Sequence, residues 1–329
     1  KGLEDRAHYR YKPLASFNEV GCTPVMMGGG RRDFYKWLSR RQADWPCAMN
    51  AGTTHDTKRS EDARHRLYAL ADMPGMWEKY AQRVLASTRP SGRISPATVL
   101  FFLQAALATW PPEGDPQQDY ADRLWQYMLK TSREGAEDTG WTWPDLSYEG
   151  DLEGYVRRVL RAPSFRRLTG RRVQRVGPVG AGDALAALAL RSLSAGAPDV
   201  YQGSETWNLT LVDPDNRAPV DFDARERLMR LCMDDGPGRK QLLKRLMEEW
   251  PGGAVKMWLM RELLKIRRGF LRATRGDYDI APLSVSGTLS DCLVAYELRG
   301  RERRLALVAP RYAGRLIRPK TGIDVGGAP

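Results

Sequence analysis

The chain has 329 residues, of which 42% are hydrophobic and 28% are charged. This balance is typical of a folded globular protein and excludes a chain that is disordered throughout. The 52 Lys and Arg residues exceed the 40 Asp and Glu residues and give a formal net charge of +12, so a basic nucleic-acid-binding protein has to be considered. No helix-turn-helix, RNA-recognition or zinc-finger pattern accompanies this charge, and we expect no nucleic-acid partner.

The cysteines and histidines give no sign of a metal site. The four cysteines lack Cys-x-x-Cys spacing and the three histidines form no His-Glu-x-x-His arrangement. Scattered cysteines favour a reducing compartment, so we place the protein in the cytoplasm. We expect no membrane span, because the longest apolar run, 97–108, is shorter than the roughly 18 residues that one requires. That run predicts a buried helix with Ser95 as its N-cap and Pro96 in its first turn.

The first segment, residues 1–59, mixes short apolar runs with a glycine-rich loop at 28–30. The uncharged run at 48–52 is its best candidate for a strand. This run leads directly into Thr-Thr-His-Asp-Thr-Lys-Arg-Ser-Glu-Asp at 53–62. The sequence therefore predicts a polar segment that is presented at the end of a strand.

His55 and Asp56 are the most informative residues of this polar segment. An ionised carboxylate accepts two charge-assisted hydrogen bonds, which suits a vicinal diol of a sugar, and these bonds tighten as a glycosidic bond breaks. Asp56 is therefore the first catalytic candidate. The alternative interpretation is that Asp56, or a Thr or Ser beside it, caps a helix that begins near Glu61.

Residues 60–180 carry apolar residues at helical spacing and predict a helical insertion. Within the insertion, an aromatic loop at 137–144 contains Trp141 and Trp143. Flat indole faces stack on the apolar faces of glucose rings, but tryptophans pack into protein cores just as readily. Both interpretations stay open for these two side chains.

Residues 181–272 predict a helix at 183–194, a stop at Gly196 and a short buried strand at 197–201. Helix, tight loop and strand follow one another in the order that a parallel barrel requires. A loop at 202–221 leaves this strand. Three more helices are expected near 223–233, 238–249 and 254–268.

Residues 273–329 change to alternating apolar and polar positions, which predicts a small antiparallel β domain. Its strands are expected at 278–285, 292–298 and 304–309. The sequence from Arg318 onward has the composition of a loose tail, and the domain looks truncated.

Three blocks along the chain resemble the maltooligosyltrehalose synthases, a family of the α-amylase superfamily. In chain order the blocks are Lys1–Asp5 with Tyr9–Tyr11 and Asn18–Gly21, then Thr53–Asp62, then Pro198–Glu205 with Leu211–Arg217. The resemblance implies an α/β fold: the C-terminal part of a (β/α)8 barrel with the helical insertion between two of its strands, followed by the small antiparallel β domain. Active sites of such barrels lie at the carboxyl ends of the strands.

The resemblance implies an intramolecular transglucosylase that converts the reducing-end α-1,4 linkage of a maltooligosaccharide into an α,α-1,1 linkage, with no cofactor. The family uses a retaining double displacement, with a carboxylate nucleophile and a carboxylic acid about 5 Å apart and a further Asp that stabilises the oxocarbenium-like state. Asp56 matches that further Asp. We find neither the Gly-x-Arg-x-Asp segment nor the strand-end Glu that would supply the other two groups. Because the chain also begins inside a matched motif, we expect the C-terminal portion of a longer enzyme, with the upstream barrel portion as its partner.

The resemblance also assigns roles to individual residues. Asp56 is carried over as the transition-state stabiliser and His55 as a hydroxyl-binding partner at the same glucose. The other substrate-binding candidates are Lys58, Arg59, Lys1, Glu19, Tyr9, Trp141, Gln202, Glu205, Asp215 and Arg217.

Several of these assignments have structural alternatives. Arg59 would instead pair with Glu61 or Asp62, and Tyr9 would pack in the core. The residues of the 202–221 loop would satisfy one another's hydrogen bonds. A noncatalytic glucan-binding remnant is the corresponding alternative for the whole chain.

Overall fold

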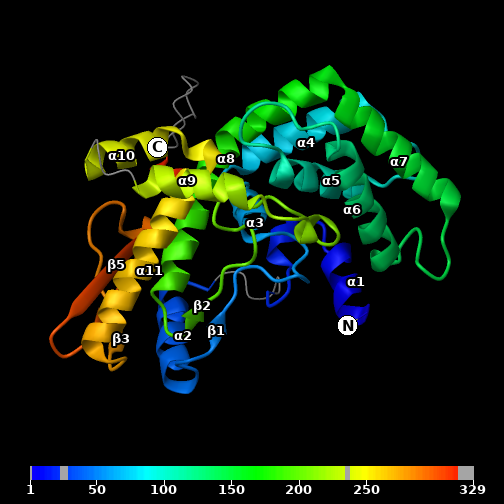
Figure 1. The fold of residues 1–329 in the computed structure, drawn as a ribbon. Coiled ribbons are helices and arrows are strands. Elements are labelled where there is room, and N and C mark those ends of the chain that lie inside the picture. The colour runs from blue at the N-terminus through cyan, green and yellow to red at the C-terminus, as the bar shows by residue number, and fades with distance from the viewer. Residues whose placement is uncertain (1, 23–28, 234–237, 318–329) are drawn as a thin grey trace.

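The computed structural model describes residues 2–22, 29–233 and 238–317. Lys1, one of the substrate-binding candidates, lies outside the described residues, as does the expected tail from Arg318 onward. The described chain is mostly helical and carries two small sheets (Figure 1). No helix within these three ranges is both long and apolar enough to cross a membrane.

The N-terminal region contains two helices that the sequence pattern did not predict. These are α1 (Gly2–Arg10) and α2 (Arg31–Asp44), both rich in charged residues, with the 3-10 turn η1 (Ala15–Phe17) between them. Leu38 is the buried side chain of α2. The predicted strand is confirmed but is shorter than 48–52, since β1 comprises Met49–Asn50.

Five helices build the helical layer: α3 (Glu61–Tyr68), α4 (Pro74–Thr88), α5 (Pro96–Thr109), α6 (Tyr120–Gly135) and α7 (Leu146–Arg161). Nearly every side chain of α5 is buried, so this helix forms the centre of the layer. It begins as predicted, because the Ser95 hydroxyl accepts the N–H of Thr98 and Pro96 occupies the first turn. Full burial of a side chain such as Phe102 contributes about 1.5–3 kcal/mol to stability.

The longest helix of the described chain, α8 (Pro163–Ser192), connects this layer to the strands. The sequence pattern placed a helix only at 183–194 and a domain boundary near residue 180, but α8 is continuous through that boundary with Pro178 inside it. Gly180 touches α3 so closely that a Cβ atom there would lie 2.6 Å from the Cα of Arg66. A small residue at this position therefore lets α3 pack directly on α8.

The strand pair consists of β1 and β2 (Ala197–Pro198), which run parallel with Met49 opposite Ala197. Gly196 precedes β2 with a φ of 100°, and a Cβ there would lie 2.1 Å from the carbonyl oxygen of Ala48. Only glycine meets both conditions. The predicted order of helix, tight loop and strand is confirmed, although β2 is shorter than 197–201. The described residues contribute two parallel strands and no closed barrel.

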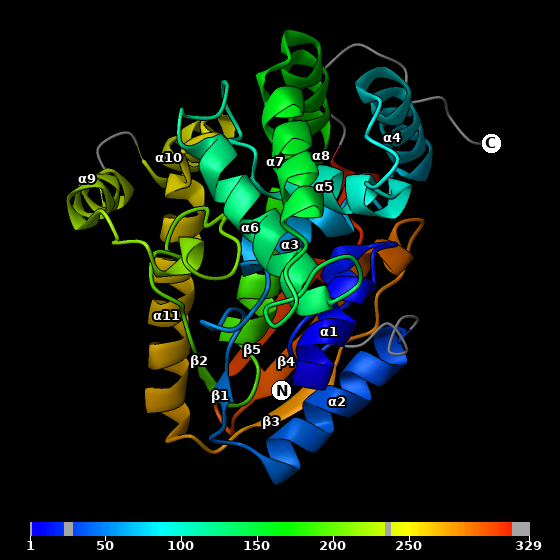
Figure 2. The ribbon, with the colours of Figure 1, turned by 90° about the vertical axis from the view of Figure 1, so that its right-hand side faces the viewer.

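The C-terminal region follows the sequence prediction closely. Its helices are α9 (Phe222–Met233), α10 (Arg239–Glu248) and α11 (Ala254–Thr274), and its strands are β3 (Asp279–Pro282), β4 (Leu293–Arg299) and β5 (Arg304–Pro310), before the short α12 (Ala313–Leu316). The three strands form an antiparallel sheet in the order β3-β4-β5, which confirms the predicted small antiparallel sheet. Figure 2 shows the sheet between α11 and α2. Tyr296 of β4 shares a core with Leu38 of α2 and Phe270 of α11.

Candidate functional site

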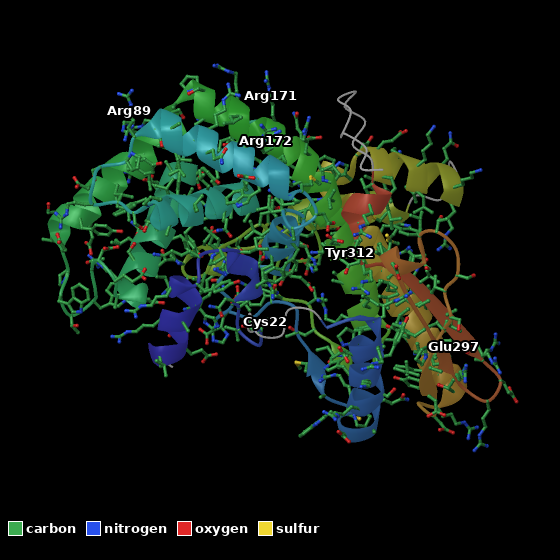
Figure 3. The ribbon with its side chains drawn as sticks, turned by 180° about the vertical axis from the view of Figure 1, so that it is seen from behind. Cys22, Arg89, Arg171, Arg172, Glu297 and Tyr312 are labelled. Carbon is green, nitrogen blue, oxygen red and sulfur yellow. The ribbon has the colours of Figure 1, made fainter. Side chains whose placement is uncertain are left out.

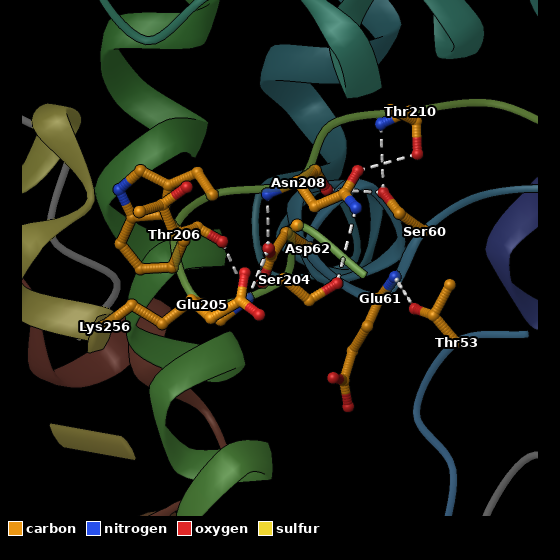
Figure 4. Close-up of polar contacts among 12 residues, drawn as sticks. Thr53, Ser60, Glu61, Asp62, Ser204, Glu205, Thr206, Asn208, Thr210 and Lys256 are labelled. Atoms are coloured by element: carbon orange, nitrogen blue, oxygen red, sulfur yellow. Dashed lines mark hydrogen bonds and ion pairs between the residues drawn. The ribbon is translucent and has the colours of Figure 1, made fainter. Parts of the chain in front are cut away.

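The polar segment after β1 and the loop after β2 lie side by side. The N–H of Ser60 donates to the carbonyl of Thr210 at 3.0 Å, and the N–H of Val212 donates to the carbonyl of Lys58 at 3.1 Å. The Ser60 hydroxyl donates to the carbonyl of Asn208 at 2.5 Å (Figure 4). The second and third sequence blocks therefore meet at the ends of the two strands.

His55 and Asp56 occupy the tip of a turn that two threonines hold. The Thr57 hydroxyl donates to the carbonyl of Thr54 at 2.8 Å, and the N–H of Asp56 donates to the Thr54 hydroxyl at 3.3 Å. The His55 Nε2 lies 3.5 Å from the Asp56 Oδ2, and the two side chains are 66% and 43% exposed. Asn216, from the third block, donates its side-chain amide to the carbonyl of His55 at 3.0 Å. The structure thus presents an imidazole and a carboxylate together toward solvent.

The helix-capping interpretation is confirmed for Thr53. Its hydroxyl accepts the N–H of Glu61, the first residue of α3, at 2.8 Å. Ser60 stands at the N-cap position but makes no capping bond with its side chain. Thr53 therefore fixes the start of α3 while Asp56 stays on the turn that precedes it.

The carboxylate of Glu19 joins the first block to the second. Its Oε1 accepts the N–H groups of Val20 and Lys58 at 3.0 and 2.7 Å. Its Oε2 accepts both the N–H and the guanidinium of Arg59 at 3.1 Å. Four donors converge on one carboxylate, so Glu19 fixes the backbone directly behind the turn.

Burial changes the interpretation of Glu19 and Arg59. Their side chains are 0% and 1% exposed, so neither reaches a sugar in this structure. The alternative that Arg59 pairs with Glu61 or Asp62 is also wrong. Arg59 pairs with Glu19, while Glu61 pairs with Arg191 and Asp62 pairs with Lys256. Glu19 and Arg59 therefore form a buried ion pair behind the turn and hold its backbone in place.

Lys58 and Tyr9 are buried as well. The Lys58 Nζ lies 2.8 Å from the Asp5 Oδ1 and 5.3 Å from the centre of the Tyr9 ring. Tyr9 is 2% exposed, which confirms the packing alternative and leaves no face for a sugar. Burial raises the pKa of the Tyr9 hydroxyl well above its ordinary value, so it stays neutral. In this structure Lys58, a substrate-binding candidate, is instead buried in an ion pair with Asp5.

A second buried ion pair lies on the far side of the segment and was not predicted. The Asp62 Oδ2 is 2.6 Å from the Lys256 Nζ and accepts the N–H of Asn208 at 2.8 Å. Lys256 also donates to the carbonyl of Thr206 at 3.2 Å (Figure 4). Burial raises the pKa of Asp62 more strongly than the Lys256 charge lowers it. The pair clamps the loop after β2 between α3 and α11.

In the loop after β2, the substrate-binding candidate Asp215 has its hydrogen bonds supplied by neighbouring residues. Asp215 accepts two hydrogen bonds from the Arg123 guanidinium of α6, at 2.8 and 2.9 Å, and the N–H of Leu211 at 2.9 Å. The alternative that the loop satisfies itself is therefore confirmed only in part for Asp215, because Leu211 belongs to the loop but Arg123 belongs to α6. Arg217 is different, since it is 52% exposed with its Nε 3.5 Å from the Asp213 Oδ1.

Gln202 and Glu205 lie at the start of the same loop. Gln202 is exposed, and its amide nitrogen lies 3.5 Å from the carbonyl of Asn216. The Glu205 Oε2 lies 4.0 Å from the Arg225 Nε, and the Glu205 side chain is 37% exposed. Gln202 and Arg217 are thus on the solvent side of the loop, where substrate contact stays a prediction.

The aromatic loop presents Trp141 to solvent. Trp141 is 58% exposed and Trp143 is 48% exposed, so the core-packing interpretation is wrong. The Arg133 guanidinium lies 4.9 Å from the centre of the Trp141 ring and is itself held by two bonds to Glu149, at 2.8 and 2.6 Å. The exposed indole of Trp141 therefore packs against an Arg133 guanidinium that Glu149 holds in place.

A cavity of about 540 Å³ opens beside β1, next to the turn. Polar side chains from the strand, the turn and two helices line it: Asn50, Thr54, Thr57, Glu61, His65 and Arg191. Burial would raise the pKa of Glu61, but the paired Arg191 guanidinium outweighs burial and the pKa falls to about 2. Burial lowers the pKa of His65 to about 4, so this imidazole is neutral near pH 7.

Comparison with known proteins shows which family this chain belongs to. No family model matches the chain. Two curated proteins from Mycobacterium tuberculosis strains that bear the name maltooligosyl trehalose synthase are 39% identical to it over 229 residues. The match covers 68% of this chain and 29% of theirs. The chain belongs to the maltooligosyl trehalose synthase family. It spans less than a third of the length of these curated members.

Solved maltooligosyl trehalose synthases share the fold. One crystal structure matches with a TM-score of 0.79 and 26% identity, over 90% of this chain and 39% of that chain. The maltooligosyltrehalose synthase of Arthrobacter ramosus matches with a TM-score of 0.75 and 33% identity, over 91% of this chain and 37% of that one. The three sequence blocks therefore converge in a fold that solved maltooligosyl trehalose synthases share.

Sequence reasoning missed the buried ion pairs that surround this candidate site. The ion pair of Asp62 and Lys256 was missed because its members are 194 residues apart. One signal was available: Lys256 stands among Ala254, Val255 and Met257, all buried apolar residues of α11. A lysine on such a face needs a buried partner.

Proposed function

We propose that this chain supplies part of the active site of an intramolecular transglucosylase. The enzyme would convert the reducing-end α-1,4 linkage of a maltooligosaccharide to α,α-1,1 by a retaining double displacement, giving maltooligosyltrehalose. The observation that carries the proposal is the convergence of three separate blocks on one turn, with His55 and Asp56 at its tip. The names of the relatives support the same activity.

Asp56 is assigned the role of stabilising the positive charge that develops on the sugar ring. In the oxocarbenium-like state the ring carries partial positive charge, and a carboxylate that binds its hydroxyls stabilises that state more than the ground state. His55, 3.5 Å away, would bind a hydroxyl of the same glucose. The Thr54–Thr57 bonds and the Asn216 amide hold both residues in place, so little reorganisation accompanies the reaction.

The carboxylate nucleophile and the general acid are assigned to the upstream barrel portion of the same enzyme. The open strand pair supports this, because within the described residues β1 and β2 pair only with each other. An apolar-lined groove of about 770 Å³ along α11, with Pro198, Met260 and Leu264 in its wall, supports it further. Unpaired strand edges and an apolar face are what a missing neighbour would cover.

The test is the loss of reducing ends from maltopentaose by this chain together with its upstream portion. We expect turnover by the natural sequence and a rate about 100- to 1,000-fold lower for Asp56→Asn, because one transition-state contact is lost. Asp279→Asn, which removes the same charge from an exposed position at the start of β3, serves as the matched control and should leave the rate unchanged. An Asp56→Asn assembly that is folded and turns over at the natural rate would contradict the proposal.

The exposed indole of Trp141 favours a second candidate, a glucan-binding protein without activity. In that case every folded assembly would lack turnover, yet maltopentaose would bind and Trp141→Ala would weaken binding. Trp45→Ala, which alters a tryptophan that is 66% exposed in another region, provides the control. In an active enzyme, Trp141→Ala should instead raise the ratio of hydrolysis to isomerisation, since the aromatic loop would help to exclude water.

A further inference from the structure

Arginines gather around a cavity that the proposed function does not use. The cavity has a volume of about 390 Å³ and lies between α4, α7 and the first turns of α8. Four arginines line it, Arg83, Arg158, Arg167 and Arg171, and its described lining contains no Asp or Glu. Figure 3 shows Arg171 on the outer edge of the helical layer, away from Cys22, which lines the cavity beside β1. We call this second cavity the arginine pocket.

Most of the positive charge in the arginine pocket has no acidic partner among the residues that the structure describes. Within the described ranges, Arg83, Arg167 and Arg171 form no ion pair. Arg158 is fixed differently, because it donates to the carbonyl of Thr88 at the end of α4, at 2.9 Å. One arginine is therefore held by the backbone, and three present guanidinium groups without an acidic partner.

Neighbouring arginines intensify this positive field. Burial, and after it the charge of Arg175, lowers the pKa of Arg172, and Arg83 and Arg171 act in the same direction. The Arg172 Nε is buried with no hydrogen-bond partner among the described residues. A cluster of like charges that repel one another is stabilised when an anion binds among them.

The rest of the arginine pocket suits the organic part of a small anion. Ser87, Thr88 and Ser164 line it with hydroxyl groups, and Val84, Val159, Phe165 and Leu168 line it with apolar side chains. A guanidinium binds two phosphate oxygens at once, and an apolar wall packs against a ring. The volume falls in the range of about 300–1,000 Å³ found for small-ligand sites. A nucleic-acid strand would instead need a continuous groove with exposed aromatic platforms.

We propose that the arginine pocket binds a small phosphorylated metabolite. Arg167 and Arg171 bind the phosphate, Arg83 neutralises it from α4, and the apolar wall holds the sugar or base. The site is separate from the turn that carries His55 and Asp56, so it serves to regulate or locate the enzyme rather than to perform its chemistry.

Calorimetric titration of the full chain tests this site with AMP and glucose 6-phosphate as probes. Their neutral counterparts, adenosine and glucose, measure the part of the affinity that the phosphate supplies. We expect at least one phosphate probe to bind with a Kd below about 1 mM and its neutral counterpart to bind about tenfold more weakly or worse. Preference for AMP identifies a nucleotide site, and preference for glucose 6-phosphate identifies a sugar-phosphate site.

Paired variants separate a built site from general positive charge. Arg167→Gln with Arg171→Gln should weaken the phosphate probe about tenfold or more, the loss of roughly one charged contact. Arg301→Gln with Arg303→Gln removes the same charge from the exposed end of the β4–β5 hairpin and should leave affinity unchanged. Arg83→Gln, on a different helix, provides a second variant should the first pair fail to fold.

Three results would overturn the proposal. One is the absence of binding by both phosphate probes below about 1 mM. Another is an equal loss of affinity in the pocket pair and the control pair. The third is tight binding of a single-stranded DNA 20-mer with no binding of either small probe, which would identify the arginines as a nucleic-acid surface.

Discussion

The two halves of the polar segment, residues 54–57 and 58–62, use charge in opposite ways. The first half carries His55 and Asp56 on an exposed turn, 3.5 Å apart and open to solvent. The second half carries Arg59 and Asp62, each almost fully buried and each paired with a residue from a distant part of the chain. Nine consecutive residues thus contain both the proposed reacting groups and members of the buried ion pairs that hold the segment in place.

The contrast predicts that the exposed Asp56 carboxylate contributes less to the stability of the fold than the buried ion pairs do. An exposed ion pair gains little stability because water competes for both charges. A buried pair is costly to disrupt, since removing one partner leaves a charge with neither water nor a counter-ion. Stability is therefore expected to depend on the second half of the segment and turnover on the first.

The largest effect on stability should come from Lys256→Ala, which leaves Asp62 buried without its cation. We expect a loss of about 3–5 kcal/mol in the free energy of unfolding, measured by urea denaturation at pH 7. Lys265→Ala, on the exposed face of the same helix, should cost less than about 1 kcal/mol. Equal losses in the two variants would show that burial of the pair does not matter.

Acid should disrupt the next support, the pair of Glu61 and Arg191. The folded-state pKa of Glu61 is lowered from 4.5 to about 2, so its contribution is complete above pH 4.5 and is lost as the pH falls toward 2. We expect up to about 3 kcal/mol of stability to disappear across that window. Glu61→Gln should flatten this part of the pH profile, while exposed Glu78→Gln should leave it as steep as before.

Glu19→Gln tests the support behind the turn. The amide cannot accept from all four donors, and Arg59 loses its counter-ion, so we expect a loss of about 2–3 kcal/mol. Glu4→Gln on the exposed face of α1 is the control. Thermal unfolding of both variants measures the difference, and a Glu19→Gln protein as stable as the control would remove Glu19 from the supporting set.

The smallest change in stability should accompany the largest change in rate. Asp56→Asn is expected to alter the free energy of unfolding by no more than about 0.5 kcal/mol, because its side chain is 43% exposed. The same protein should lose most of its turnover of maltopentaose. A destabilised Asp56→Asn variant would erase the distinction between the two halves of the segment.

The sequence predicted those parts of the fold that are specified locally. The start of α5 was predictable from Ser95 and Pro96, and the strands of the β domain from their alternating pattern. Highly charged α1 and α2 were missed because they carry too few apolar residues for a periodic signal. The full length of α8 was missed because Pro178 usually ends a helix, and its tertiary contacts overrode that tendency.

In the candidate site, too, the features that are specified locally were predicted and those that depend on tertiary contacts were not. The resemblance assigned substrate-binding candidates to all three blocks, but only the structure shows that the blocks contact one another. His55 and Asp56 follow the predicted strand on an exposed turn. The partner of Arg59 could not be predicted, because Glu61 and Asp62 are closer in sequence than Glu19 and only the packed structure excludes them. The burial of Lys58 and Tyr9 was likewise set by the neighbouring helices rather than by any local pattern.

The length of α8 sets the distance between the two regions of the molecule that lie at its ends. Its 30 residues rise about 45 Å at the usual helical spacing of about 1.5 Å per residue. The helix begins at the arginine pocket and ends at the tight loop that enters β2, with Gly180 seated against α3 between the two ends. The helix therefore sets the distance between the arginine pocket and the strand pair. A longer or shorter α8 would change that distance and displace one of the two relative to the other.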